Sequence, residues 1–187
     1  MKLRRAIALF LCLLLLAPLT ACGKTLTDEE ALAILRERIE ASYELNEIYF
    51  GAGLRTDPYE DNGEAFQYVF VAIDEKYQSV DDLKAATEAV FSATVCGKLY
   101  EKAFTGVDDG QVILYARYVE QGGILTADVK YQGIPTARDF LFETAKILEN
   151  TANYVVFEIE RAEHDKPVRI EMTRAADGRW LLNSYTY

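Results

Sequence analysis

The sequence predicts an α+β fold in which two or three N-terminal helices pack on a curved antiparallel sheet of about five to seven strands. Apolar residues recur at helical spacing in the first half of the chain, and two of these segments begin with capping residues. From Gln111 onward the apolar period changes to two, and turns rich in glycine separate short segments. Short turns favour antiparallel pairing, with helices covering one face of the sheet and water reaching the other.

The first helix is expected to begin after Thr27 and to run to about Glu47. The run Thr27-Asp28-Glu29-Glu30 has the form of a capping box, and its carboxylates lie where the helix dipole is positive. One face carries apolar side chains at helical spacing, and charged residues cover the opposite face.

Residues 54–64 form an expected loop that is rich in carboxylates: Asp57, Glu60, Asp61 and Glu64. An EF-hand loop needs oxygen ligands at positions 1, 3 and 5 before its glycine at position 6. If Gly63 takes position 6, Pro58 takes position 1 and supplies no side-chain oxygen. We therefore interpret this segment as a solvated acidic loop that offers a candidate contact surface, and no metal site is expected.

The remaining elements alternate between strand and helix patterns. Residues 67–73 predict a strand, and a second helix is expected after Ser79, with an apolar stripe that extends from Leu83 toward Phe104. Six further strands are expected at residues 111–119, 124–132, 140–148, 154–162, 168–175 and 180–186. Residues 137–149 could instead form a short helix.

Composition restricts the partners. The formal charge of the whole chain is −10, and it becomes −13 once the first 21 residues are removed, because these carry three basic residues and no acidic one. Binding to nucleic acid depends on cationic side chains that release counterions, so no nucleic-acid partner is expected.

No catalytic motif occurs in the chain. HExxH, CxxC, GxSxG, GxGxxG and GxxxxGK[ST] patterns are all absent from the sequence. The single histidine, His164, falls in an expected hairpin tip, and Cys96 falls in an apolar helical stretch that suits a buried structural thiol. The sequence therefore predicts a non-catalytic protein without a cofactor.

The aromatic residues provide the other candidate site. Twelve tyrosines and one tryptophan are present, and those on the expected strands include Tyr115, Tyr131 and Trp180. Tyr115 and Tyr118 have opposite parity in one strand, so at most one of them can point inward. Sheet packing explains such residues, whereas an aromatic-lined mouth for a ligand or peptide is the functional alternative.

The N-terminus, MKLRRAIALFLCLLLLAPLTAC, has the order of a secretory signal peptide, with basic residues first, a short apolar run next and small residues last. Its last four residues, Leu19-Thr20-Ala21-Cys22, resemble the lipobox of bacterial lipoproteins. This resemblance implies cleavage after residue 21, lipidation of Cys22, and a bilayer anchor on the outer face of the bacterial cytoplasmic membrane. The alternative is an ordinary secreted protein cut near Ala21. We accordingly expect a signal peptide at 1–21, a lipidated tether at 22–26 and a single α+β domain at 27–187.

The order of the elements resembles the NTF2-like or cystatin-like class, whose sheet bends around a helix into a cone. The segments SVDDLKAATEAVFS, ILYARYVEQGG and DGRWLLNSYTY are similar to small exported lipoproteins of Gram-positive bacteria, some of which are grouped with IseA type inhibitors of cell-wall DL-endopeptidases. The resemblance implies an extracytoplasmic binding module that regulates a cell-wall hydrolase through a cell-envelope protein or peptidoglycan. An NTF2-like enzyme and a small-ligand carrier, both using the cone as a pocket, remain the alternatives.

Overall fold

The computed structural model describes residues 24–108 and 113–187, and within them the fold is α+β. The helices are α2 (Asp28–Tyr49), α3 (Val80–Glu88) and α4 (Ala93–Tyr100), and α4 continues into a π-helical turn, η2 (Glu101–Thr105). The expected signal peptide and Cys22 lie outside the described residues, as do residues 109–112 of the expected turn and strand. No helix in the described part of the chain is both long and apolar enough to cross a membrane.

Helix α2 begins where the capping box predicts. The Thr27 hydroxyl accepts a hydrogen bond from the Glu30 amide at 3.2 Å, and the Glu30 carboxylate accepts one from the Thr27 amide at 2.8 Å. These two bonds satisfy amides that the first turn of a helix leaves without partners. The helix extends slightly beyond the expected end at Glu47, to Tyr49.

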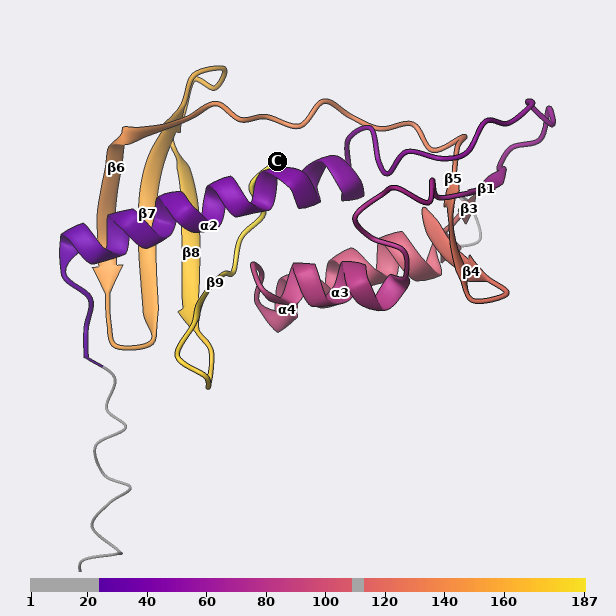
Figure 1. Cartoon of the computed structure of the whole chain (residues 1–187). Coiled ribbons are helices and arrows are strands. Elements are labelled where there is room, and N and C mark those ends of the chain that lie inside the picture. Colours follow the sequence, from indigo (N-terminus) through magenta and orange to yellow (C-terminus); the bar gives the residue numbers. More distant parts are fainter. Residues whose placement is uncertain (1–23, 109–112) are drawn as a thin grey trace, which may run out of the picture.

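The larger sheet contains the strands β6 (Phe140–Asn150), β7 (Tyr154–Arg161), β8 (Val168–Arg174) and β9 (Trp180–Leu182), paired antiparallel in sequence order. The prediction of strands here is confirmed, and residues 140–150 form a strand instead of the alternative helix. Helix α2 lies across one face of this sheet (Figure 1). The main hydrophobic core fills the space between them, and its fully buried members include Leu35, Ile39, Phe157 and Met172.

A second sheet lies beyond the C-terminal end of α2 (Figure 1). It has the strand order β1 (Tyr68–Phe70), β5 (Ile124–Asp128), β4 (Tyr118–Gln121), and all its pairings are antiparallel. Gly122 and Gly123 join β4 to β5 with φ values of 62° and 82°, which glycine adopts without steric cost. The strands β2 (Val107–Asp108) and β3 (Ile113–Leu114) form a separate short pair.

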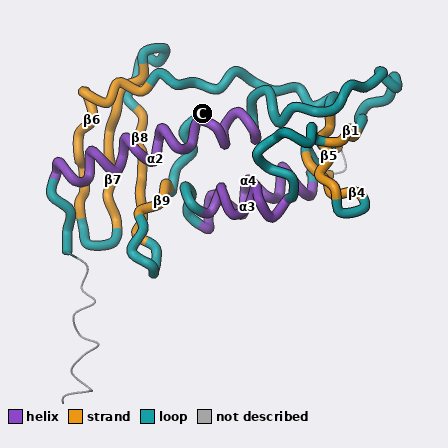
Figure 2. Tube along the Cα trace, in the orientation of Figure 1, coloured by secondary structure: helices purple, strands orange, loops and turns teal. Residues whose placement is uncertain are grey.

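The expectation of a single curved sheet was wrong, because the strands belong to separate sheets. The expected strand at 124–132 ends at Asp128, whose side chain accepts a hydrogen bond from the Lys130 amide at 3.0 Å and so forms a local turn. Residues 129–139, which we call the strap, then run without regular structure from β5 to β6 (Figure 2). Pro135 lacks an amide hydrogen and cannot contribute to a strand ladder there.

The apolar stripe that begins at Leu83 is divided between two helices. Phe91 forms a parallel bridge with Leu182 of β9, and the Ser92 amide donates to the Leu182 carbonyl at 2.8 Å. The Ser92 hydroxyl then caps α4 by accepting from the Val95 amide. Pairing with the larger sheet therefore stops α3 and restarts the helix as α4.

A smaller core joins the second sheet to α3 and to the end of α2. Its members include Ile48, Leu83, Tyr118 and Leu125. Neighbouring residues of the same α2 turn, Leu45 and Tyr49, belong to the main core. One helix therefore contributes to both cores.

Candidate functional site: an aromatic hollow at the end of α2

The C-terminal end of α2 is held by two side chains from the start of β4. The last turn of the helix contains no basic residue, although its carbonyl groups favour a positive charge nearby. Arg117 provides this charge and donates from Nη2 to the Gly51 carbonyl at 2.7 Å. The Tyr118 hydroxyl donates to the Ile48 carbonyl at 2.8 Å and accepts from the Leu54 amide at 3.1 Å. Burial raises the pKa of the Tyr118 phenol.

Gly53 makes this close approach possible. Its φ of +83° is a conformation that favours glycine. A Cβ atom at this position would lie 2.6 Å from Arg117 Nη2 and 3.0 Å from the Tyr118 hydroxyl. The chain that leaves α2 therefore passes directly over the two capping side chains.

The strap closes over the same place. The Ile134 amide donates to the Phe50 carbonyl at 2.7 Å, which fixes the strap to the residue after α2. The guanidinium carbon of Arg117 lies 4.1 Å from the centre of the Tyr131 ring, a cation–π contact. Tyr131 thus covers Arg117 on one side.

A hollow of about 560 Å³ is lined in part by Tyr131. We call it the aromatic hollow, and its lining consists of Phe50, Ala65, Lys102, Tyr115, Asp128, Lys130, Tyr131, Gln132, Ile134 and Tyr187. The Phe50 and Tyr187 rings stack with their centres 3.7 Å apart, and Tyr115 packs against Phe66 at 4.2 Å. Its volume falls in the range of small-molecule and peptide sites.

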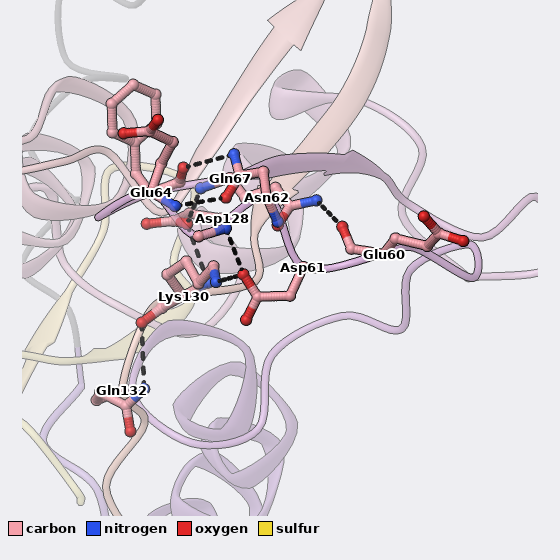
Figure 3. Close-up of polar contacts among 10 residues, drawn as sticks. Glu60, Asp61, Asn62, Glu64, Gln67, Asp128, Lys130 and Gln132 are labelled. Atoms are coloured by element: carbon pink, nitrogen blue, oxygen red, sulfur yellow. Dashed lines mark hydrogen bonds and ion pairs between the residues drawn. The ribbon is translucent and has the colours of Figure 1, made fainter.

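The charged residues of the lining differ in how they are neutralised. The ammonium group of Lys130 pairs with Asp61, and this contact holds the pKa of the Asp61 carboxyl below its usual value (Figure 3). Oδ1 of Asp128 accepts from the backbone amides of Gln67 and Lys130, both at 3.0 Å. Lys102 is exposed and forms no ion pair with any described residue.

Two further spaces adjoin this hollow. A polar pocket of about 240 Å³ lies against Gly53, Arg117 and Asp128, and an open groove of about 510 Å³ follows the strap from Tyr131 to Thr136. Tyr131 contributes to the lining of both spaces and to that of the aromatic hollow. The strap residue Tyr131 is therefore the centre of the hollowed surface.

The structure brings together some of the residues that the sequence singled out. Tyr115 and Tyr131 both line the aromatic hollow, and Asp61 contacts it through Lys130. The other loop carboxylates, Asp57, Glu60 and Glu64, are exposed and do not line it. Trp180 is 7% exposed and belongs to the main core.

Sequence reasoning missed the residues that come from distant segments. Phe50 follows α2, Lys102 lies in η2, Arg117 precedes β4 and Tyr187 is far along the chain. Only Arg117 carried a signal, as a single cation among apolar and aromatic residues in the run ILYARYV. The other three meet only through the tertiary fold.

The described residues contain no group of three or more His, Cys, Asp and Glu side chains that could hold a metal ion. Cys96 is 3% exposed, and burial raises the pKa of its thiol, which disfavours the reactive thiolate. His164 is exposed between β7 and β8. Neither residue lines the aromatic hollow.

Comparison with known proteins assigns no family to the chain: no family model matches it, and no curated protein gives a significant match.

Proposed function

We propose that this protein is a non-catalytic binding module of the bacterial cell envelope, exported and anchored to the outer face of the cytoplasmic membrane through lipidated Cys22. Its binding site is the aromatic hollow. The observation that carries the proposal is the aromatic lining of a hollow of about 560 Å³ next to a strap without regular structure.

The exposure of the lining supports this choice. Tyr115 and Tyr131 are each 39% exposed, and Ile134 is 51% exposed. Large apolar side chains that gather in one exposed concave place are typical of interaction sites. Tyrosine suits such a site because it offers a broad apolar ring and a polar hydroxyl while losing little conformational freedom.

Within this proposal the module regulates or inhibits a cell-wall hydrolase, by holding either the enzyme or the peptidoglycan that the enzyme cuts. The exposed carboxylates Asp57, Glu60 and Glu64 of the loop before β1 offer an additional contact surface. We keep the NTF2-like or cystatin-like class in the proposal, supported by a long N-terminal helix that lies across an antiparallel sheet.

The test uses isolated peptidoglycan. The purified chain is expected to sediment with it and to slow its digestion by an endopeptidase. Replacing Tyr131 with alanine should weaken both effects, whereas Tyr154→Ala on β7 should not, because Tyr154 lies outside the hollow. Absence of both effects in the unmodified chain, or equal effects in the two variants, contradicts the proposal.

The anchor has its own test. Metabolic labelling with a fatty acid should label the full chain and should not label Cys22→Ala. The matched variant Cys96→Ala removes a buried thiol and should keep the label. Labelling that survives in Cys22→Ala rules out this anchor.

An enzyme or small-ligand carrier of NTF2-like type is the second candidate, and Asp128 favours it. This residue is 8% exposed and lines the hollow together with Tyr131, so a carboxylate and a phenol, both groups that can act in acid–base catalysis, lie at the same space. Turnover that disappears in Asp128→Asn would support the enzyme, and a small molecule that copurifies with the chain would support the carrier.

A further inference from the structure

A narrow cavity of about 20 Å³ adjoins the aromatic hollow, and it shares Phe50, Lys102 and Tyr131 with it. Arg117 also lines this cavity, so its lining contains two basic residues. Its lining contains no carboxylate. In a chain with a formal charge of −10, a lining that contains two basic residues and no carboxylate is an unusual local arrangement.

Arg117 and Arg161 are the two buried cations of the described residues, and only Arg161 forms an ion pair, with Asp139. Arg117 is 4% exposed, and a guanidinium keeps its charge at any physiological pH. Nη2 donates to the Gly51 carbonyl, while Nη1 is buried and has no hydrogen-bond partner among the described residues. A buried charge without a counterion costs free energy. The Tyr131 ring and the Gly51 carbonyl compensate the Arg117 charge in part, but they leave the Nη1 donor without a hydrogen bond.

Other cations near the hollow already have carboxylate partners. Arg55 pairs with Asp74 and Glu75, and Lys130 pairs with Asp61. Within the described residues, neither Arg117 nor Lys102 has such a partner. Arg117 and Lys102 are thus the two basic residues of the narrow cavity, and neither is neutralised by a carboxylate of the described residues.

We propose that the aromatic hollow takes a ligand with an apolar body and a terminal carboxylate, and that Arg117 and Lys102 bind the carboxylate at the narrow cavity. This inference rests on the proposed function and specifies its ligand class. A volume of about 20 Å³ accepts one water-sized group, which is the size of a carboxylate oxygen, while the much larger hollow accepts the body. Charged hydrogen bonds from Arg and Lys are the usual way to hold a carboxylate.

Asp128 determines which end of the ligand faces the narrow cavity. It lines the hollow but not the narrow cavity, so its negative charge repels a carboxylate from its own side. The carboxylate therefore faces Arg117 and Lys102, and the apolar body lies against Phe50, Tyr115 and Tyr187.

The first experiment compares N-acetylphenylalanine with its amide, using the full chain purified in detergent and isothermal titration calorimetry. The two probes differ only in the terminal group, which is a charged carboxylate in the acid and a neutral primary amide of similar size in the other. We expect the acid to bind at least about tenfold more tightly, the factor that one charge-assisted hydrogen bond provides. Equal affinities overturn the inference and indicate that the narrow cavity holds solvent only.

Variants then locate the carboxylate. Lys102→Met should weaken binding of the acid severalfold and leave the amide unaffected. Lys98→Met on α4 makes the same change of charge on an exposed residue outside both linings and should have no effect. Arg117→Lys keeps the charge but removes the planar pair of donors, and it too should lower the affinity for the acid. An equal loss in Lys102→Met and Lys98→Met contradicts the assignment.

Peptidoglycan fragments separate this inference from the function on which it rests and identify the source of the carboxylate. Fragments with free carboxyl groups should bind, and the same fragments with amidated carboxyl groups should not. Binding of both preparations overturns the carboxylate inference but supports the binding function. Binding of the small acid without binding of any fragment overturns the envelope function and assigns the site to a free carboxylate ligand.

Discussion

Two buried arginines, Arg161 and Arg117, show how differently the same side chain can be used in one fold. Arg161 is 8% exposed, and its Nε donates to Asp139 at 2.8 Å. Arg117 is 4% exposed and has a carbonyl and a ring as partners instead of a carboxylate. The first guanidinium is neutralised by a carboxylate, whereas Nη1 of the second has no hydrogen-bond partner among the described residues.

Removing Asp139 should expose the cost of an unpaired Arg161. Asp139→Ala is expected to lower the free energy of unfolding by about 3 kcal/mol, because it leaves a buried cation without its partner. Urea denaturation followed by circular dichroism measures this loss. Asp165→Ala changes an exposed residue in the β7–β8 connection and should shift the urea midpoint little. A similar shift in both variants would contradict a stabilising role for the Asp139–Arg161 ion pair.

The same pair predicts a pH dependence. Burial by itself raises the pKa of Asp139, but hydrogen bonds from Arg161 and from the Glu163 amide outweigh it and hold this pKa below its ordinary value. A lowered pKa in the folded state contributes stability above the unfolded pKa of about 4, and this contribution is lost as the pH falls through the folded value. The stability difference between the wild type and Asp139→Ala should therefore be constant from pH 7 to 5 and shrink below about pH 4. A difference that stays constant to pH 2 contradicts this linkage.

At the scale of elements, the end of α2 depends on the Tyr118 hydroxyl. Tyr118→Phe removes the group that bridges the Ile48 carbonyl and the Leu54 amide, and both would remain buried without this partner. The expected loss of stability is about 1–3 kcal/mol. Thermal unfolding measures it, with Tyr154→Phe on β7 as the control. Equal melting temperatures for Tyr118→Phe and the wild type would mean that the bridge contributes nothing.

Local patterns predicted the elements better than their assembly. The capping box located the start of α2, and period-two segments located β6, β7, β8 and β9, because these signals lie within a few residues of the elements they define. The division into separate sheets was not predictable in this way. It depends on a turn at Asp128 and on docking of the strap at Phe50, which is far away in the sequence.

The candidate site was predictable only in part. The concentration of tyrosines drew attention to Tyr115 and Tyr131, which line one hollow. The same reasoning included Trp180, which packs in the main core, because strand parity does not tell which sheet a strand joins. The cations at the narrow cavity come from η2 and from the start of β4, and only the packed fold places them side by side.

At the scale of the whole molecule, α2 connects the two hydrophobic cores. Leu83 is fully buried in the smaller core, and its replacement with alanine should cost about 2–5 kcal/mol. Because α2 is shared, this loss should also lower the unfolding midpoint of the main core. Trp180, the single tryptophan, is buried in that core and reports on it by fluorescence. A fluorescence midpoint that stays unchanged in Leu83→Ala would show that the two cores unfold independently.

The length of α2 determines how far the aromatic hollow lies from the N-terminal anchor. A helix of 22 residues at 1.5 Å per residue spans about 33 Å, and the hollow lies at the end opposite Thr27. The few residues between Cys22 and the helix add at most roughly 17 Å when fully extended. With Cys22 embedded in the bilayer, as proposed, the aromatic hollow lies at most roughly 50 Å above the lipid surface. A binding partner must therefore come within that distance of the membrane.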